Sequence, residues 1–538
     1  MSPKSQLGDL VDSYLDLKWH VDPVEATGAG VASHDGRLGA YRDEDVSQFI
    51  AALKSLGAAF EECEIGSLED EIDRTAVLND LRVTIHRFER ERPQTKDPSF
   101  WITHALEGLY LLLALRDRPA DHRRRAVADR VAAIPGFLEH ARSTLESCPT
   151  PFLATAAEVT HAGGLLVDQV REEFVPSEEA NFADACEAAK AALSSFADHL
   201  DSLSTEEASG DFAIGERAFN FRLQYEHAIQ AVASEIWRYG HSLIDEVESQ
   251  LDELAKDISP AVRWPDLVHR LRGTHPAADE LVQAYKDGME RAYRFVEHED
   301  LVTIPDGSLE VVPTPAFLRP LIPFAAYQPP GAFSEDRTGW FYVTQPSGDT
   351  AQADVDRALR DHCTYEIACT SLHEGVPGHH LQFLRAQTQT RKVRKVLGTP
   401  LTIEGWALYC EDLMDESGFY QNREERFFQR LALMWRAVRV VVDVGLHTRG
   451  MSFDEAVDLL VNRVHFDAKS AGAEVRRYCA HPAYQLCYAV GRRELKALRD
   501  AYRERTGGEY TLRKFHDAVL SYGGLPVSLI RWGMGLGS

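Results

Sequence analysis

The stretch SLHEGVPGHHLQ, residues 371–382, places three histidines and one glutamate within eight positions, from His373 to His380. The sequence on either side of it is typical of a helix. Neutral imidazole nitrogens beside a carboxylate are the groups that a zinc-dependent hydrolase uses, because the metal polarises a water molecule and the acid accepts its proton. The stretch therefore predicts a zinc site inside a mainly helical protein.

The spacing of these histidines is unusual, because a common zinc-binding helix carries two histidines four residues apart. Here Pro377 occupies the position four residues after His373. In an undistorted helix His379 is turned by roughly 240° from His373, and His380 lies roughly 10 Å further along the axis. Since proline lacks the backbone donor and glycine tolerates unusual dihedral angles, we expect a two-residue bulge at 376–378. The bulge favours His373 and His379 as ligands and His380 as a substrate contact. His380 as the second ligand and a loop without metal are the alternatives.

Three glutamates complete the predicted centre. Glu374 follows the first histidine and is the expected general base, which passes a proton from the attacking water to the leaving amine. Glu404 opens the helical segment EGWALYCEDLMDE and is the expected third ligand, since catalytic zinc uses three protein ligands and one open position. The alternative interpretation of Glu404 is an acid at a helix N-terminus, favoured by the helix dipole. Glu411 lies seven residues later near the same face and is expected to orient a ligand histidine.

The segment WRAVRVVVDVGLH, residues 435–447, carries polar residues at four-residue spacing in an otherwise apolar helix. Arg439, Asp443 and His447 therefore share one face. Charges buried among so many valines cost free energy unless they are paired or functional. Two interpretations follow: an ion pair that only stabilises the helix, or a role for His447 beside the metal, which makes His447 a candidate catalytic residue.

The segment RRYCAHPAYQLCYAVG, residues 476–491, brings arginines and tyrosines together. A tyrosine O–H near the metal stabilises the oxyanion of a tetrahedral intermediate, and Tyr488 is the candidate for this role. An arginine holds a substrate carboxylate through two hydrogen bonds, and the candidate is Arg477, with Tyr484 as a further substrate contact. Ordinary packing of aromatic side chains and surface arginines is the alternative.

The composition narrows the class of protein. The 538 residues are 44% hydrophobic and 26% charged, as in a soluble globular protein. A net charge of -26 argues against a general nucleic-acid binder, whose surface is basic. We find no signal peptide at the start, and the longest apolar run, around Leu109–Leu115, is too short to span a bilayer. The eight cysteines form no CxxC pair, which disfavours disulfides. We therefore expect a cytoplasmic protein without nucleic-acid or membrane partners.

Hydrophobic spacing predicts helices over most of the chain, for example at Asp45–Leu56 and His227–Ile258. Short β-prone runs separated by proline and glycine interrupt this pattern at Leu309–Val312, Phe324–Gln328 and Gly339–Thr344. These runs predict a small sheet among helices.

The expected organisation is a helical N-terminal lobe over residues 1–300, a small β-rich segment over 301–350 and a helical catalytic lobe with the zinc site over 351–538. The predicted fold class is mainly α, with two lobes and a small β-sheet at the cleft between them. The edge of this sheet either takes up an extended peptide as an added strand or only closes the lobe.

Several segments, spread over nearly the whole chain, resemble one known family. They are DPVEATGAGVASHDGRL (22–38), HEGVPGHHLQ (373–382), EGWALYCEDLMDESGFY (404–420), WRAVRVVVDVGLH (435–447), GMSFDEAVDLLV (450–461) and RYCAHPAYQLCYAVG (477–491). Together they resemble the bacterial DUF885 family, an α-helical group placed near the zincin metallopeptidases.

The resemblance implies a zincin-like, peptidase-like fold and zinc. The family's HExxPGHH segment looks like the HExGH helix of a metallocarboxypeptidase or oligopeptidase with two residues inserted, which matches His379 to the second ligand. The chain departs from the family in the last segment. Where the family has a PGQ…YKIG pattern, this chain has Pro482-Ala483-Tyr484-Gln485 and then Tyr488-Ala489-Val490-Gly491, without the glycine and the lysine.

The sequence thus predicts a Zn²⁺-dependent hydrolase that cleaves a peptide or a related amide bond, as an oligopeptidase or a carboxypeptidase does. A deep cleft between helical lobes favours short peptides or small amides as substrates. The alternatives are a metal-dependent enzyme acting on a non-peptide amide metabolite, and a non-catalytic helical scaffold that keeps the motif without the metal. The sequence does not specify the physiological substrate, exo- or endo-cleavage, or the oligomeric state.

Overall fold

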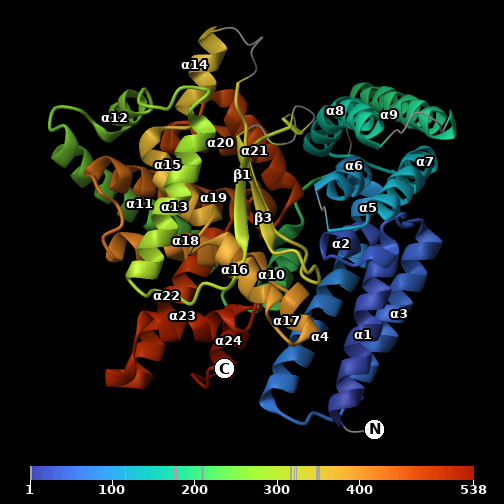
Figure 1. Cartoon of the computed structure of the whole chain (residues 1–538), viewed down its shortest axis with the longest axis horizontal. Helices are drawn as coiled ribbons and strands as arrows, with labels where there is room; N and C mark the ends of the chain where they lie inside the picture. Colours follow the sequence, from blue (N-terminus) through green and yellow to red (C-terminus); the bar gives the residue numbers. More distant parts are fainter. Residues whose placement is uncertain are drawn as a thin grey trace. The chain divides into compact units, whose positions relative to one another are not determined.

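The structure is a computed structural model and is mainly helical, as predicted, with one small three-stranded sheet (Figure 1). It describes residues 3–114, 117–174, 180–206, 211–315, 318–319, 322, 324–346 and 352–537. The chain forms two compact units. The first comprises residues 1–212 with 315–321 and 330–336, and the second comprises residues 213–314, 322–329 and 337–538.

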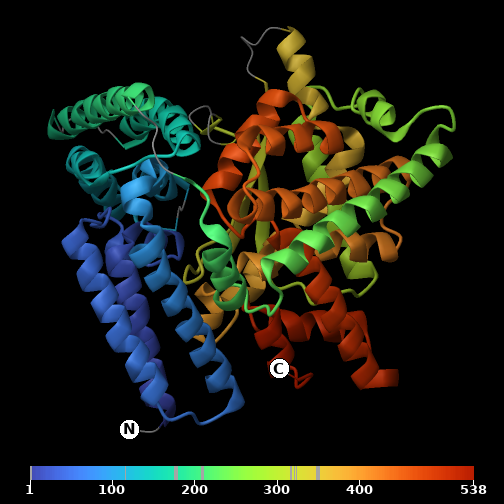
Figure 2. The same cartoon turned by 180° about the vertical axis from the view of Figure 1, so that it is seen from behind.

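The first unit is built from helices, of which α1, α3 and α4 lie side by side (Figures 1 and 2). A buried guanidinium ties its early residues to later helices: Arg130 of α7 donates to Thr27 Oγ1 at 2.6 Å and to the carbonyl of Arg37 at 3.0 Å. Because a buried arginine is costly unless its donors are satisfied, these contacts fix the segment between α1 and α3. The helices are α1 (Pro3–Val21), α2 (Pro23–Gly28), α3 (Asp43–Glu62), α4 (Leu68–His86), α5 (Pro93–Lys96), α6 (Pro98–Ala114), α7 (Ala120–Thr144), α8 (Thr150–Phe174) and α9 (Ala180–Glu206), with short turns η1 (Ala32–His34) and η2 (Arg87–Glu91).

The second unit is organised around α19, which packs against α11, α15, α20, α21 and α22. Residues 213–300, predicted to belong to the N-terminal lobe, lie in this unit because α11 packs along α19. The two helices approach so closely that a Cβ on Gly240 of α11 would meet Val441 at 2.9 Å. The helices are α10 (Gly215–Tyr225), α11 (Ala233–Ile258), α12 (Trp264–Leu271), α13 (Leu281–His298), α14 (Gln352–Arg360), α15 (Thr364–Glu374), α16 (His379–Gln387), α17 (Lys392–Val396), α18 (Pro400–Glu416), α19 (Arg423–Thr448), α20 (Phe453–Val464), α21 (Ala468–Ala480), α22 (Cys487–Thr506), α23 (Leu512–Leu520) and α24 (Val527–Gly533), with a short turn η4 (Gly507–Glu509).

The sheet confirms the three predicted β-prone runs. Its strands are β1 (Ser308–Pro313), β2 (Ala325–Gln328) and β3 (Thr338–Val343), in the order β1-β3-β2. Strand β3 pairs in parallel with β1 and antiparallel with β2. Val311, Phe341 and Val343 pack with Tyr285 and Met289 of α13 in one buried cluster, so α13 anchors the sheet. Residues 316–317, 320–321, 323 and 347–350 of the predicted β-rich segment lie outside the described residues.

Two properties bear on the environment of the protein. All eight cysteines are buried, and none is in a disulfide. Among the described residues, no helix has both the length and the apolar character needed to cross a bilayer.

A buried histidine, His516 of α23, is hydrogen-bonded to the helix α18. Its Nε2 accepts a hydrogen bond from the Tyr409 hydroxyl at 2.8 Å, and its Nδ1–H donates to the carbonyl of Leu301 at 2.6 Å. These two partners suit the neutral ring, which has one acceptor and one donor. Burial lowers the pKa of His516 to about 4.

We expect this histidine to make the protein sensitive to acid. The pKa of His516 in the folded protein lies below its value of about 6.5 in an unfolded chain. Its contribution to stability is therefore complete above about pH 6.5 and is lost as the pH falls through about 4. Between pH 7 and pH 4 the wild type should lose about 3 kcal/mol more unfolding free energy than His516→Gln, measured by urea denaturation. An equal loss in both proteins would contradict the assignment.

Candidate metal centre

The two histidine-bearing helices are separated by a tight turn. We predicted one helix with a two-residue bulge, but α15 ends at Glu374 and α16 begins at His379. In the turn, Gly378 N–H donates to the carbonyl of Leu372 at 3.0 Å, and the Pro377 carbonyl accepts from Trp406 Nε1 of α18 at 2.8 Å. A Cβ on Gly378 would overlap the carbonyl of His373. The turn thus requires glycine, and α18 holds it in place.

This turn brings three predicted ligands together. One candidate ligand atom from each of His373, His379 and Glu404 lies within 4.8 Å of the other two. His379 Nε2 is 3.3 Å from Glu404 Oε2, and the two imidazole rings stand at 90° with their centroids 4.9 Å apart. Glu404 comes from the second turn of α18, so its position depends on the packing of α18 against the turn. Two imidazoles and one carboxylate are a donor set that suits Zn²⁺.

Two neighbouring side chains, those of Glu411 and Tyr484, contact residues of the cluster and fix their orientation. His373 Nδ1 is 2.8 Å from Glu411 Oε1, which leaves His373 Nε2 available to the cluster. The sequence predicted that Glu411 orients a ligand histidine, without indicating which one. The hydroxyl of Tyr484 donates to Glu404 Oε1 at 2.5 Å. Outer partners of this kind fix the orientation of metal ligands. Tyr484, predicted as a substrate contact, thus holds the carboxylate of Glu404, the predicted third ligand.

The electrostatics of the cluster favour a bound cation. Burial alone would raise the pKa of Glu404, but hydrogen bonds from His379 and Tyr484 and the charge of His379 lower it to about 2. Burial lowers the pKa of His379, yet Glu404 and Glu374 outweigh burial and raise it. Carboxylates therefore dominate the potential around the imidazoles. A proton or a metal ion compensates this negative charge, and the two compete for the same nitrogen.

Two predicted catalytic side chains have free functional groups. Glu374 ends α15 beside His373, is half-buried, and its carboxylate has no hydrogen-bond or ion-pair partner among the described residues. Tyr488 is buried, and within the described part of the chain its hydroxyl makes no hydrogen bond. Burial raises the pKa of Tyr488 to about 12, so the hydroxyl keeps its proton at neutral pH and can donate it.

The other predicted site residues are engaged elsewhere. His380 Nδ1 lies 3.0 Å from the hydroxyl of Tyr327 on β2, and burial lowers the pKa of His380 to about 4. Arg477 forms an ion pair with Glu474 at 2.8 Å. His447 Nε2 donates to the carbonyl of Tyr478 at 3.0 Å and links α19 to α21. The structure therefore places His379, and not His380, in the cluster, and it gives His447 a contact with main chain.

The polar face of α19 holds the tyrosine-bearing loop. Arg439 and Asp443 do not form an ion pair with each other, because Arg439 pairs with Glu474 at 3.0 Å. Asp443 instead accepts hydrogen bonds from the backbone N–H groups of Ala483 at 3.0 Å and Leu486 at 3.1 Å. Ala483 has a φ of 62°, the left-handed region that favours glycine, and it stands where the resembled pattern has glycine. The sequence did not reveal this role of Asp443, because residue spacing does not show which side chain accepts hydrogen bonds from the N–H groups of a distant loop.

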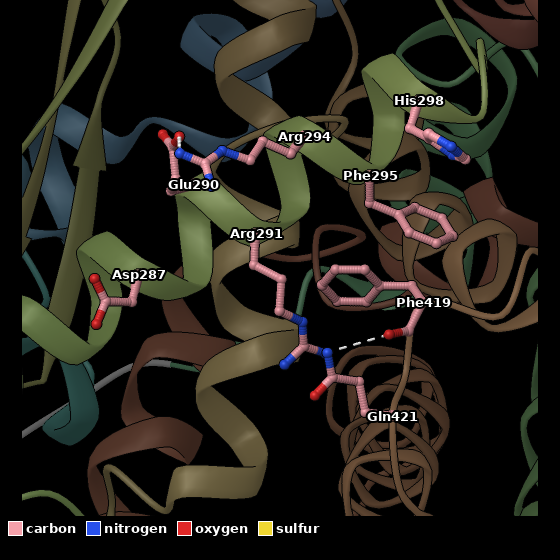
Figure 3. Close-up of a pocket in the computed structure, with 8 residues that line it drawn as sticks. All are labelled: Asp287, Glu290, Arg291, Arg294, Phe295, His298, Phe419 and Gln421. Carbon is pink, nitrogen blue, oxygen red and sulfur yellow. Dashed lines mark hydrogen bonds and ion pairs between the residues drawn. The ribbon is translucent and has the colours of Figure 1, made fainter.

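A surface pocket of about 580 Å³ lies between α13 and the segment after α18 (Figure 3). Arg291 points into it, but its guanidinium is paired with Glu425 at 2.9 Å and donates to the carbonyl of Phe419 at 3.3 Å. The pocket contains none of the predicted site residues. It is lined by Asp287, Glu290, Arg291, Arg294, Phe295, His298, Phe419 and Gln421.

Comparison with known proteins identifies the fold and the family. No curated protein matches the sequence. The fold is shared with a protein from Shewanella oneidensis, described as a candidate lipoprotein of unknown function, at 21% identity and a TM-score of 0.81, over 98% of this chain and 99% of that one. It is also shared with a candidate lipoprotein from Colwellia psychrerythraea at 16% identity and a TM-score of 0.85, over 99% of both chains. The profile of a family described as bacterial protein of unknown function (DUF885) matches residues 23–534. The chain therefore belongs to the DUF885 family.

Proposed function

We propose that the protein is a zinc-dependent hydrolase that cleaves a peptide bond or a related amide bond. The observation that carries this proposal is the convergence of His373, His379 and Glu404, one ligand atom of each lying within 4.8 Å of the others, beside the unpartnered carboxylate of Glu374. Catalytic zinc sites combine three such ligands with an adjacent general base.

In this proposal His373, His379 and Glu404 hold the metal. Zn²⁺ supplies Lewis acidity, which makes a water molecule more acidic and a substrate carbonyl more electrophilic. Glu411 keeps His373 in the tautomer whose Nε2 faces the cluster, because its carboxylate can only accept the Nδ1–H hydrogen bond. Tyr484 restrains Glu404 in the same way.

Glu374 performs the proton transfer. Its carboxylate accepts a proton from the attacking water and then delivers it to the amine that leaves, so the residue returns to its starting state. Its place directly after His373, at the end of α15, supports this role, as does the absence of any competing partner among the described side chains.

Tyr488 stabilises the negative charge that develops on the carbonyl oxygen. A hydroxyl in a buried position is an effective donor to an oxyanion, because little water competes for it. These proposed roles together supply the ligands, the base and the oxyanion donor that a metallopeptidase requires. We propose on this basis that the fold is a two-lobed, zincin-like fold. We also propose that the enzyme acts on short peptides.

Metal removal tests the proposal. We expect protein saturated with Zn²⁺ to hydrolyse members of a library of short peptides. Hydrolysis should stop after treatment with a chelator and should recover when one equivalent of Zn²⁺ is restored. Cleavage is measured by mass spectrometry, and a parallel set of non-peptide amides separates the two substrate classes. Hydrolysis that is insensitive to the chelator, or no hydrolysis by the zinc-saturated protein, would contradict the proposal.

A further inference from the structure

An excess of positive charge lies next to the tyrosines of the proposed site. Arg439 and Arg477 both pair with the same carboxylate, Glu474, at 3.0 Å and 2.8 Å. A third guanidinium, that of Arg436, belongs to the same group, because Arg436 and Arg439 both stack against the Trp435 ring, at 4.7 Å and 3.9 Å from its centroid. Two of these three cations thus share one anion, Glu474, in a chain whose net charge is -26.

Arg436 is the member of this group that has no ion-pair partner among the described residues. No carboxylate of a described residue lies within 4.0 Å of its guanidinium. Its Nη1 makes one long hydrogen bond, of 3.4 Å, to the carbonyl of Ala432 in its own helix, and its buried Nε has no partner. A half-buried guanidinium is normally satisfied by an anion, since its desolvated donors otherwise cost free energy.

Contacts connect Arg436 to the proposed metal ligands. Its guanidinium lies 5.7 Å from the centroid of the Tyr488 ring, and the Tyr488 ring lies 6.2 Å from that of Tyr484. The hydroxyl of Tyr484 in turn donates to Glu404. Two tyrosine rings therefore link the guanidinium of Arg436 to the carboxylate of Glu404.

We propose that Arg436 binds a carboxylate of the substrate, so that the hydrolase prefers peptides with a free carboxylate close to the bond that is cleaved. This inference rests on the proposed function and adds the substrate class. Guanidinium groups bind carboxylates through two parallel hydrogen bonds, and Arg436 has donors to offer for this purpose. Arg477, which the sequence suggested for this role, already has Glu474. The carboxylate is either the C-terminal α-carboxylate or the side chain of an aspartate or glutamate.

The test compares substrates within each protein. Four short peptides differ only in a C-terminal acid or amide and in a glutamate or glutamine next to the cleaved bond. We expect zinc-saturated wild type to cleave the peptide with the productive carboxylate with a kcat/KM roughly 100-fold above that of its neutral counterpart. Arg436→Met should reduce this ratio to about 1, and Arg436→Lys should retain part of it. Because both rates come from one sample, the ratio is independent of the folded fraction.

Arg423→Met is the matched control, since Arg423 lies on the same helix α19 but is 61% exposed. Its guanidinium donates to the carbonyl of Asp257 at 2.9 Å and lies 4.0 Å from the carboxylate of that residue. This variant should leave the ratio unchanged. Wild type that cleaves charged and neutral peptides equally well would overturn the inference while leaving the hydrolase intact. A large ratio that survives in Arg436→Met would also overturn it, because another cation would then bind the carboxylate. No cleavage of any peptide by the zinc-saturated wild type would remove the proposed function and this inference with it.

Discussion

Replacing Glu374 by glutamine is expected to lower kcat for peptide hydrolysis by roughly 1,000-fold, the typical contribution of a general base. Glutamine keeps the shape and the hydrogen-bonding length of the side chain but cannot accept a proton. Since Glu374 makes no hydrogen bond or ion pair within the described residues, unfolding free energy and zinc content should stay at wild-type values. Hydrolysis is measured with the best peptide of the library, and zinc by elemental analysis.

The control for this variant is Glu494→Gln on α22, a half-exposed carboxylate that pairs with Arg493 at 2.8 Å. It changes the net charge by the same amount and should leave kcat at the wild-type value. If Glu374→Gln hydrolyses peptides as fast as the wild type while retaining its zinc, Glu374 is not the base and the mechanism fails at that step.

Replacing Gly491 by alanine is expected to destabilise the helix pair that carries Glu404. A Cβ on Gly491 of α22 would overlap the carbonyl of Leu401 on α18, and the facing Gly405 approaches just as closely, since its own Cβ would lie 2.5 Å from Gly491 Cα. Neither backbone can yield without moving a helix. We expect a loss of about 3 kcal/mol in unfolding free energy and weaker zinc binding, because α18 carries Glu404. Urea denaturation and zinc titration measure the two effects.

Gly472→Ala provides the comparison, because Gly472 lies in helix α21 and a Cβ there would meet only Arg476 Nη1, at 3.9 Å. Alanine is favoured over glycine in a helix by up to about 1 kcal/mol, so this variant should be neutral or more stable than the wild type. Equal stability of Gly491→Ala and the wild type would mean that α18 and α22 are not packed as closely as described.

The sequence predicted the elements well where the signal was local. The three β-prone runs match the strands to within about a residue at each end, because alternating apolar residues between prolines and glycines leave few other conformations. The unit boundary could not be read in the same way. It depends on the packing of α11 against α19, two helices nearly 200 residues apart in the chain. The amphipathic pattern of a helix shows which face is buried but not which helix packs against it.

For the candidate site, the residue types were predictable and their partners were only partly so. The helix geometry required a distortion between His373 and His379, but the full break depends on Trp406, which binds the turn from another helix. The seven-residue spacing of Glu404 and Glu411 predicted that Glu411 orients a ligand histidine, and the structure identifies that histidine as His373. Arg477, which we predicted to hold a substrate carboxylate, is instead neutralised by Glu474.

Zinc-edge anomalous diffraction from crystals grown with Zn²⁺ tests the central claim most directly. The account predicts one strong anomalous peak at bonding distance from His373 Nε2, His379 Nε2 and a carboxylate oxygen of Glu404, and no such peak at His380. A zinc-saturated crystal with no peak among these three side chains would contradict it.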